Sequence, residues 1–129
     1  MYYFGREKQQ AFQRYIEQAT NSHAVEQLRQ RGIDAKFIDP RTRAPLEQVM
    51  ETIVASVKKM GRLLTSDDGS YSFINCTEIT ARVAEAVPGV KFKRLACPDA
   101  PRPGAPEMIN YTRVNAIDIV AAAEKVVRG

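Results

Sequence analysis

Residues 62–74 have the sequence RLLTSDDGSYSFI. Apolar residues stand on both sides of an Asp-Asp-Gly turn signal, and Gly69 supplies the positive φ angle that a tight hairpin turn needs. The stretch therefore predicts a β-hairpin with strands at residues 62–65 and 71–74. Because the two strands of a hairpin are antiparallel, this stretch favours a sheet that contains antiparallel pairs.

Apolar residues at helical spacing predict helices on both sides of this hairpin. Residues 45–60 carry an unbroken apolar stripe. Asn75 is a helix-capping residue type, and Glu78 follows at the spacing of a capping box, so a helix should begin there and end at the next Pro-Gly pair. Further helices are predicted over residues 6–20 and from the cap Asn115 to the last residues. Residues 20–22 are helix-initiating types, so a second short helix is predicted from there to Gly32, or else the first helix continues to that glycine.

Alternating apolar and polar residues predict more strands. Residues 33–37 and 90–93 alternate with period two. Residues 98–107 form a proline-rich loop, after which residues 108–114 return as a strand. The expected fold is α+β, with a mixed or antiparallel sheet of about four or five strands, about four helices packed on it and an N-terminal helical extension. This order of elements resembles that of profilin-like and roadblock-type domains.

Length and composition indicate a single domain. The chain of 129 residues is divided here into an N-terminal helical segment, 1–32, and a sheet-containing core, 33–129, which together form one domain, 1–129. No apolar run approaches the roughly 20 residues of a membrane span. The first residues lack the pattern of an export signal, and two cysteines are too few for a disulfide scaffold. We therefore expect a cytoplasmic protein with no membrane contact.

Cys76 is the strongest candidate for a reacting group. It follows a predicted strand and opens a predicted helix, where backbone N–H groups and the helix dipole stabilise a thiolate. Thr77 and Thr80 stand close by, and Cys97 could act as a resolving thiol. The alternative is that Cys76 is a small buried residue of the core, because free cysteine is often buried.

Basic residues are the second candidate feature. The chain carries 19 Lys and Arg against 15 Asp and Glu, a net charge of +4, which favours an anionic partner. If the fold gathers them, several cations form a phosphate-binding surface: Arg41, Arg43, Lys58, Lys59, Arg62, Lys91, Lys93 and Arg94. The structural alternative is that helix-end cations complement the helix dipole and strand lysines keep a sheet edge soluble.

Two smaller pairs of polar residues lack the residue types and the spacing of a complete metal or catalytic site. His23 stands three residues before Glu26, and Asp34 two before Lys36. Neither pair provides a full set of metal ligands, and the Asp-Asp pair before Gly69 is ordinary turn chemistry. We therefore predict no metal site and no cofactor.

These patterns favour a small binding or interaction module without its own catalytic machinery. The aromatic residues at positions 2–4 point to a protein partner or a homo-oligomer. Two alternatives remain open. One is a thiol-dependent enzyme or redox protein that uses Cys76, and the other is a basic nucleic-acid-binding domain.

Overall fold

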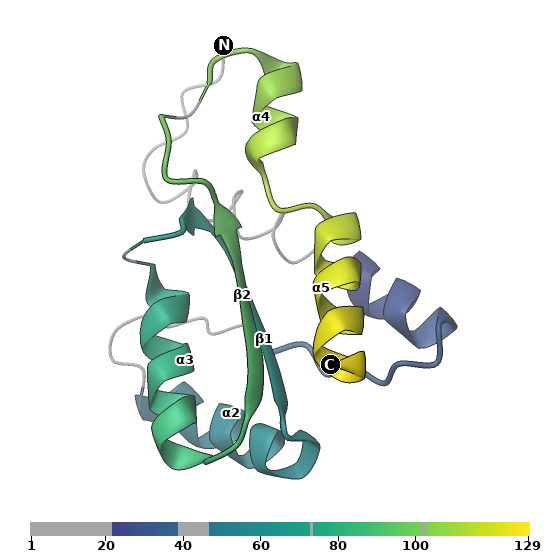
Figure 1. The fold of residues 1–129 in the computed structure, drawn as a ribbon, viewed down its shortest axis with the longest axis vertical. Coiled ribbons are helices and arrows are strands. Elements are labelled where there is room, and N and C mark those ends of the chain that lie inside the picture. The colour runs from purple at the N-terminus through teal and green to yellow at the C-terminus, as the bar shows by residue number, and fades with distance from the viewer. Residues whose placement is uncertain (1–21, 39–46, 73, 102) are drawn as a thin grey trace.

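The computed structural model describes residues 22–38, 47–72, 74–101 and 103–129. Its elements are α2 (Glu47–Met60), β1 (Arg62–Ser70), α3 (Asn75–Ala86), β2 (Lys91–Cys97), α4 (Pro106–Thr112) and α5 (Ala116–Arg128). Residues 22–30 are helical as well. The two strands lie between α2 and α3 on one face and α5 with residues 22–30 on the other (Figure 1).

The two strands are parallel. Arg62 lies opposite Lys91 and Ser66 opposite Leu95, and α3 makes the connection from β1 to β2. Strand, helix and parallel strand in this order define an α/β architecture. Helices do pack on a sheet as predicted, but the expected α+β class with a mixed or antiparallel sheet of about four or five strands is not supported. The likeness to profilin-like and roadblock-type domains fails for the same reason.

β1 runs through the residues that were predicted to turn. It advances from Ser66 to Ser70 while β2 advances only from Leu95 to Cys97, so β1 bulges at this point. The carboxylate of Asp67 accepts a hydrogen bond from the Gly69 N–H at 2.9 Å, and Gly69 does not adopt a positive φ angle. The predicted hairpin is therefore wrong, because the Asp-Asp-Gly signal makes a bulge within one strand.

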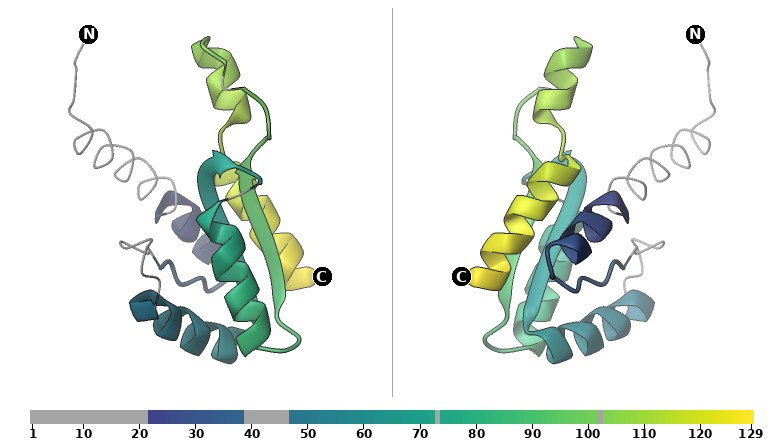
Figure 2. Two further views of the ribbon diagram at one scale, coloured as in Figure 1. Left: turned by 90° about the vertical axis from the view of Figure 1, so that its left-hand side faces the viewer. Right: turned by 90° about the vertical axis from the view of Figure 1, so that its right-hand side faces the viewer.

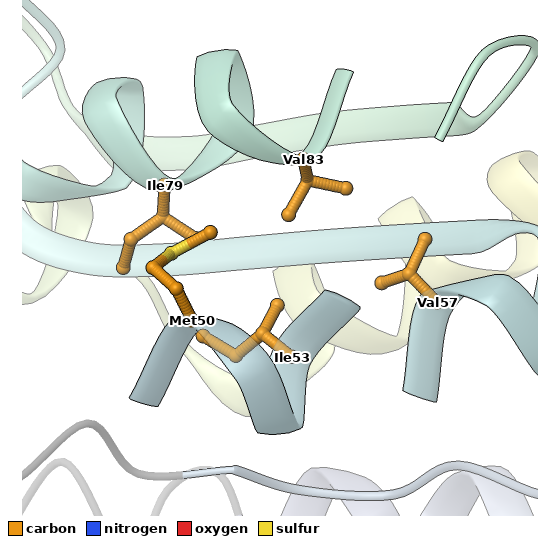
Figure 3. Close-up of a cluster of buried hydrophobic side chains, with 5 residues drawn as sticks. All are labelled: Met50, Ile53, Val57, Ile79 and Val83. Atoms are coloured by element: carbon orange, nitrogen blue, oxygen red, sulfur yellow. The ribbon is translucent and has the colours of Figure 1, made fainter. Parts of the chain in front are cut away.

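Helices α2 and α3 close one face of the strand pair. Five buried side chains interlock between them (Figure 3): Met50, Ile53, Val57, Ile79 and Val83. The apolar stripe predicted over residues 45–60 is confirmed from Glu47, where the described chain resumes. The helix predicted after residue 75 is confirmed too, but its N-cap is Ile74. Glu78 accepts a hydrogen bond from Arg82 at 2.7 Å, so the predicted capping box is wrong.

The opposite face is covered by α5 and residues 22–30, which lie side by side in Figure 2. Their contact buries Ala24, Leu28, Ile119, Val120 and Ala123. An ion pair of 2.8 Å between Arg31 and Glu124 lies beside this cluster. The first of these helices ends at Gly32, which has a φ angle of 78°, and the second begins with a capping box between Asn115 and Asp118. Both predicted boundaries are confirmed.

Two predicted strands are not strands. Residues 33–38 lie outside any helix or strand, although Ile33 and Ala35 pack inward as the alternation predicted. Residues 108–114 fall largely within α4, because Pro106 at a first helical position starts a helix there. The helix predicted over residues 6–20 and the aromatic residues 2–4 lie outside the described residues. None of the helices in the described part has the length and hydropathy of a membrane span.

Candidate functional site

The carboxyl ends of β1 and β2 meet at one edge of the strand pair, which is where α/β folds usually bind their ligands. Three segments converge there: the bulge and loop at residues 67–72, the first turn of α3, and residues 94–99. The N–H of Tyr71 donates to the Cys97 carbonyl at 2.8 Å, which joins the two loops. Helix α4 lies beyond this edge, outside the packed layers (Figure 2).

Cys76 occupies the predicted place in the first turn of α3, but it is buried. Its thiol donates to the Asp67 carboxylate at 3.8 Å. The Thr80 hydroxyl donates to the Cys76 carbonyl at 2.7 Å and lies 3.5 Å from the Thr65 hydroxyl. The surroundings of Cys76 therefore suit a packed thiol better than a nucleophile.

Cys97 is the second sequence candidate at this edge. It is the last residue of β2 and is buried, as Cys76 is, and neither cysteine forms a disulfide. The structure thus contains no disulfide between Cys76 and Cys97. The reactivity of the two thiols stays a prediction.

Among the predicted binding residues that the structure describes, Arg94 lies at this edge with its side chain held by two neighbours. Its Nη1 donates to the Thr77 hydroxyl at 2.8 Å, and its guanidinium lies over the Tyr71 ring, 4.5 Å from the centroid. Both partners are uncharged in their ordinary state. Among the described residues, no carboxylate forms an ion pair with Arg94.

Ser72 and Asp99 form a further polar contact at the edge, which the sequence analysis did not predict. The hydroxyl and the backbone N–H of Ser72 donate to the Asp99 carboxylate at 2.6 Å and 2.9 Å. The side-chain hydrogen bond from Ser72, followed by the backbone one, lowers the pKa of Asp99 below its ordinary value. In the sequence, these two residues could have been noticed as short polar residues that follow the end of each strand.

The other predicted cations do not gather around Arg94. Lys58 and Lys59 lie in the last turn of α2, and Arg62 opens β1 opposite Lys91 at the far end of the strands. The Lys91 ammonium donates to the Gly129 carbonyl at 2.9 Å. Lys93 follows Lys91 on the same side of β2, whereas Arg94 points to the other side. Arg41 and Arg43 lie outside the described residues.

The smaller polar groupings also remain separate. The His23 ring shares a hydrogen bond of 3.0 Å with Gln27, one turn along its own helix. The Lys36 ammonium donates to the Ser56 hydroxyl at 3.3 Å. Within the described ranges, no three His, Cys, Asp or Glu side chains come together as metal ligands would.

Comparison with known proteins identifies the fold to which these residues belong. A family model described as transketolase, C-terminal domain, matches residues 17–119. The chain belongs to this family. A transketolase C-terminal domain is consistent with the parallel strand pair and the helices on its two faces.

Three relatives illustrate the range of this family. The beta subunit of acetoin:2,6-dichlorophenolindophenol oxidoreductase from Cupriavidus necator is 33% identical over 82% of this chain and 32% of its own length. The mitochondrial pyruvate dehydrogenase E1 component subunit beta-1 of Arabidopsis thaliana is 34% identical over 79% and 28%. Transketolase-like protein 2 of Mus musculus is 30% identical over 81% and 16%.

This transketolase C-terminal domain spans about a third or less of the length of the relatives it matches. Two of the three relatives are named as subunits, which is consistent with a protein partner or an oligomer. None of the three names supports a nucleic-acid partner. The relatives come from bacterial and mitochondrial sources among others, so the predicted cytoplasmic location stays a prediction.

Proposed function

We propose that this transketolase C-terminal domain is an assembly module of a multi-subunit enzyme of the acetoin oxidoreductase or pyruvate dehydrogenase E1 type. In this role it supplies protein contacts, and the reacting groups come from other parts of the assembly. The observation that carries the proposal is the exposed apolar surface of α4, taken together with relatives that are named as subunits.

The α4 surface consists of Met108 and Tyr111, one helical turn apart and therefore on the same side of the helix. Their exposed fractions are 59% and 91%. Ile117, in the first turn of α5, is 76% exposed. Large apolar side chains left in water on a protruding helix are typical of protein interfaces, and tyrosine is among the residues that contribute most to binding.

The proposed occupant is a companion subunit of the same assembly. Because α4 lies outside the layers that pack around the strands, a partner can reach it without disturbing the core (Figure 1). Cys76, the candidate nucleophile, is buried beside the Asp67 carboxylate. These observations support the proposal that this domain binds other subunits and does not itself supply the reacting groups.

The proposal can be tested in a chimera. This chain would replace the matching 109-residue region of the Cupriavidus necator beta subunit, and the chimera would be expressed with the rest of its oxidoreductase. We expect the chimera to enter the assembled enzyme. Tyr111→Asp should lower the assembled fraction about tenfold, because an unpaired carboxylate in an interface is costly. Analytical ultracentrifugation measures that fraction.

The matched control is Ala84→Asp, which adds the same charge at an exposed position on α3. It should leave the assembled fraction unchanged. Circular dichroism establishes that each chimera is folded. A folded chimera that stays out of the assembly, or an assembly as sensitive to Ala84→Asp as to Tyr111→Asp, contradicts the proposal.

A further inference from the structure

Arg94 is a cation held in a fixed position by neutral groups. The stacking on Tyr71 and the hydrogen bond to Thr77 restrain its side chain from two directions. The bond to Thr77 uses Nη1, so other N–H donors of the guanidinium fork can serve a second partner. Elsewhere in the described chain, some arginines form ion pairs with a carboxylate, as Arg31 does with Glu124. The described residues offer Arg94 no such carboxylate.

Exposed aromatic side chains flank this cation. Tyr71 is 43% exposed beneath the guanidinium. Phe92 stands two residues before Arg94 on β2, on the same side of the strand, and is 49% exposed. The Arg94 surface, defined as Tyr71, Thr77, Phe92 and Arg94, thus combines one oriented cation with exposed aromatic side chains.

We propose that the Arg94 surface docks an acidic segment of a partner protein, with an Asp or Glu side chain paired to the guanidinium and an apolar neighbour on Phe92 or Tyr71. Charge complementarity supports this occupant, because a guanidinium fork matches a carboxylate in geometry as well as in charge. A cation oriented in advance loses little side-chain freedom when it binds, which favours the pair.

A nucleic acid fits this surface less well. Phosphates along a strand require a row of cations, and the nearest lysine in sequence, Lys93, points to the opposite side of β2. Lys91, at the far end of the strand, is engaged with the Gly129 carbonyl. A single oriented cation stacked on one aromatic ring is suited to one carboxylate within a mixed acidic and apolar segment.

The inference does not rest on the proposed assembly role, because the α4 surface and the Arg94 surface share no residue. The chimera experiment leaves Arg94 unchanged, and the binding experiment below leaves α4 unchanged. Either proposal can therefore fail while the other stands.

The test uses the full chain and a fluorescein-labelled peptide, Gly-Glu-Phe-Glu-Phe-Glu-Gly, with a matched peptide that carries Gln in place of each Glu. Fluorescence anisotropy measures binding to the wild type, Arg94→Gln, Arg94→Lys and Arg29→Gln, the last being the control that removes an exposed arginine elsewhere. Nuclear magnetic resonance on the wild type locates the bound peptide without any substitution.

We expect the acidic peptide to shift the resonances of Tyr71, Thr77, Phe92 and Arg94. Arg94→Gln should weaken binding about fivefold or more, Arg94→Lys less than that, and Arg29→Gln by less than about twofold. Equal binding of the Glu and Gln peptides, equal loss in the two Gln variants, or shifts located elsewhere would overturn the proposal. Arg94-dependent binding of oligodeoxythymidylate tighter than that of the peptide would overturn it in favour of a nucleic acid.

Discussion

At the scale of single residues, Gly69 permits the bulge in β1. A Cβ atom at this position would lie 2.8 Å from the Ile74 Cγ2 and 3.3 Å from the Asp67 carboxylate, whereas one at Gly104 would meet nothing within 4 Å. Gly69→Ala should therefore cost about 1–3 kcal/mol of unfolding free energy through overpacking. Gly104→Ala should change it by less than about 0.5 kcal/mol. Urea unfolding of both variants checks this, and equal stabilities would contradict it.

The Ser72–Asp99 contact makes a prediction about pH. Hydrogen bonds from Ser72 hold the pKa of Asp99 below its ordinary value in the folded chain. A carboxylate with a depressed folded pKa stabilises the fold above its unfolded pKa, and this contribution disappears as pH falls through the folded value. Ser72→Ala should raise the pKa of Asp99 towards its ordinary value, because one of the two hydrogen bonds that lower it is lost. A carboxyl-carbon titration by nuclear magnetic resonance measures it, and an unchanged pKa would count against the contact.

Cys76 makes a prediction about reactivity. Because its side chain is buried and donates to Asp67, iodoacetamide should modify it more slowly than free cysteine at neutral pH and rapidly only after unfolding. Mass spectrometry of the native protein measures the rate. Fast labelling of the folded chain would restore the thiol-enzyme alternative.

At the scale of elements, α5 depends on its capping box for a defined start. Asn115 is the N-cap, and its N–H donates to the Asp118 carboxylate at 2.9 Å. Replacing a capping asparagine by alanine typically costs about 1 kcal/mol. Asn115→Ala should therefore lower the midpoint of urea unfolding with no change in its slope. An unchanged midpoint would show that packing alone sets the boundary of α5.

The sequence predicts long elements better than short ones. The helices α2, α3 and α5 each bury one apolar stripe, which periodicity reveals directly. Short apolar runs are ambiguous between helix and strand, and so residues 108–114 were assigned to a strand. The Asp-Asp-Gly signal predicts a hairpin turn, which is wrong here, because the same residue types also occur at a bulge within one strand.

The same limit applies to the candidate site. Helix-start chemistry placed Cys76 correctly in the first turn of α3. The Ser72–Asp99 and Thr77–Arg94 contacts, in contrast, join residues that are far apart in the sequence. The parallel pairing of β1 and β2 brings these residues together. Contacts between distant segments leave no local pattern in the sequence from which they could be predicted. The position of Arg94 on a strand could be predicted, but not the groups that fix it.

At the scale of the whole molecule, membership of the transketolase C-terminal domain family replaces the predicted α+β class with an α/β class. The carboxyl ends of the strands and helix α4 lie towards one end of the molecule (Figure 1). The amino ends of the strands carry Arg62 and Lys91 instead. This difference between the two ends is consistent with a domain that binds other proteins at one end.

The central claim is that this domain contributes contacts and not reacting groups. The most direct test is the rate of acetoin-dependent 2,6-dichlorophenolindophenol reduction per assembled complex, measured in the chimera and in its Cys76→Ala and Tyr111→Asp variants. We predict a rate per assembled complex within about twofold of the chimera for both variants, because each complex that does assemble keeps its reacting groups. A loss of about a hundredfold or more in fully assembled Cys76→Ala would place a reacting group in this domain and contradict the account.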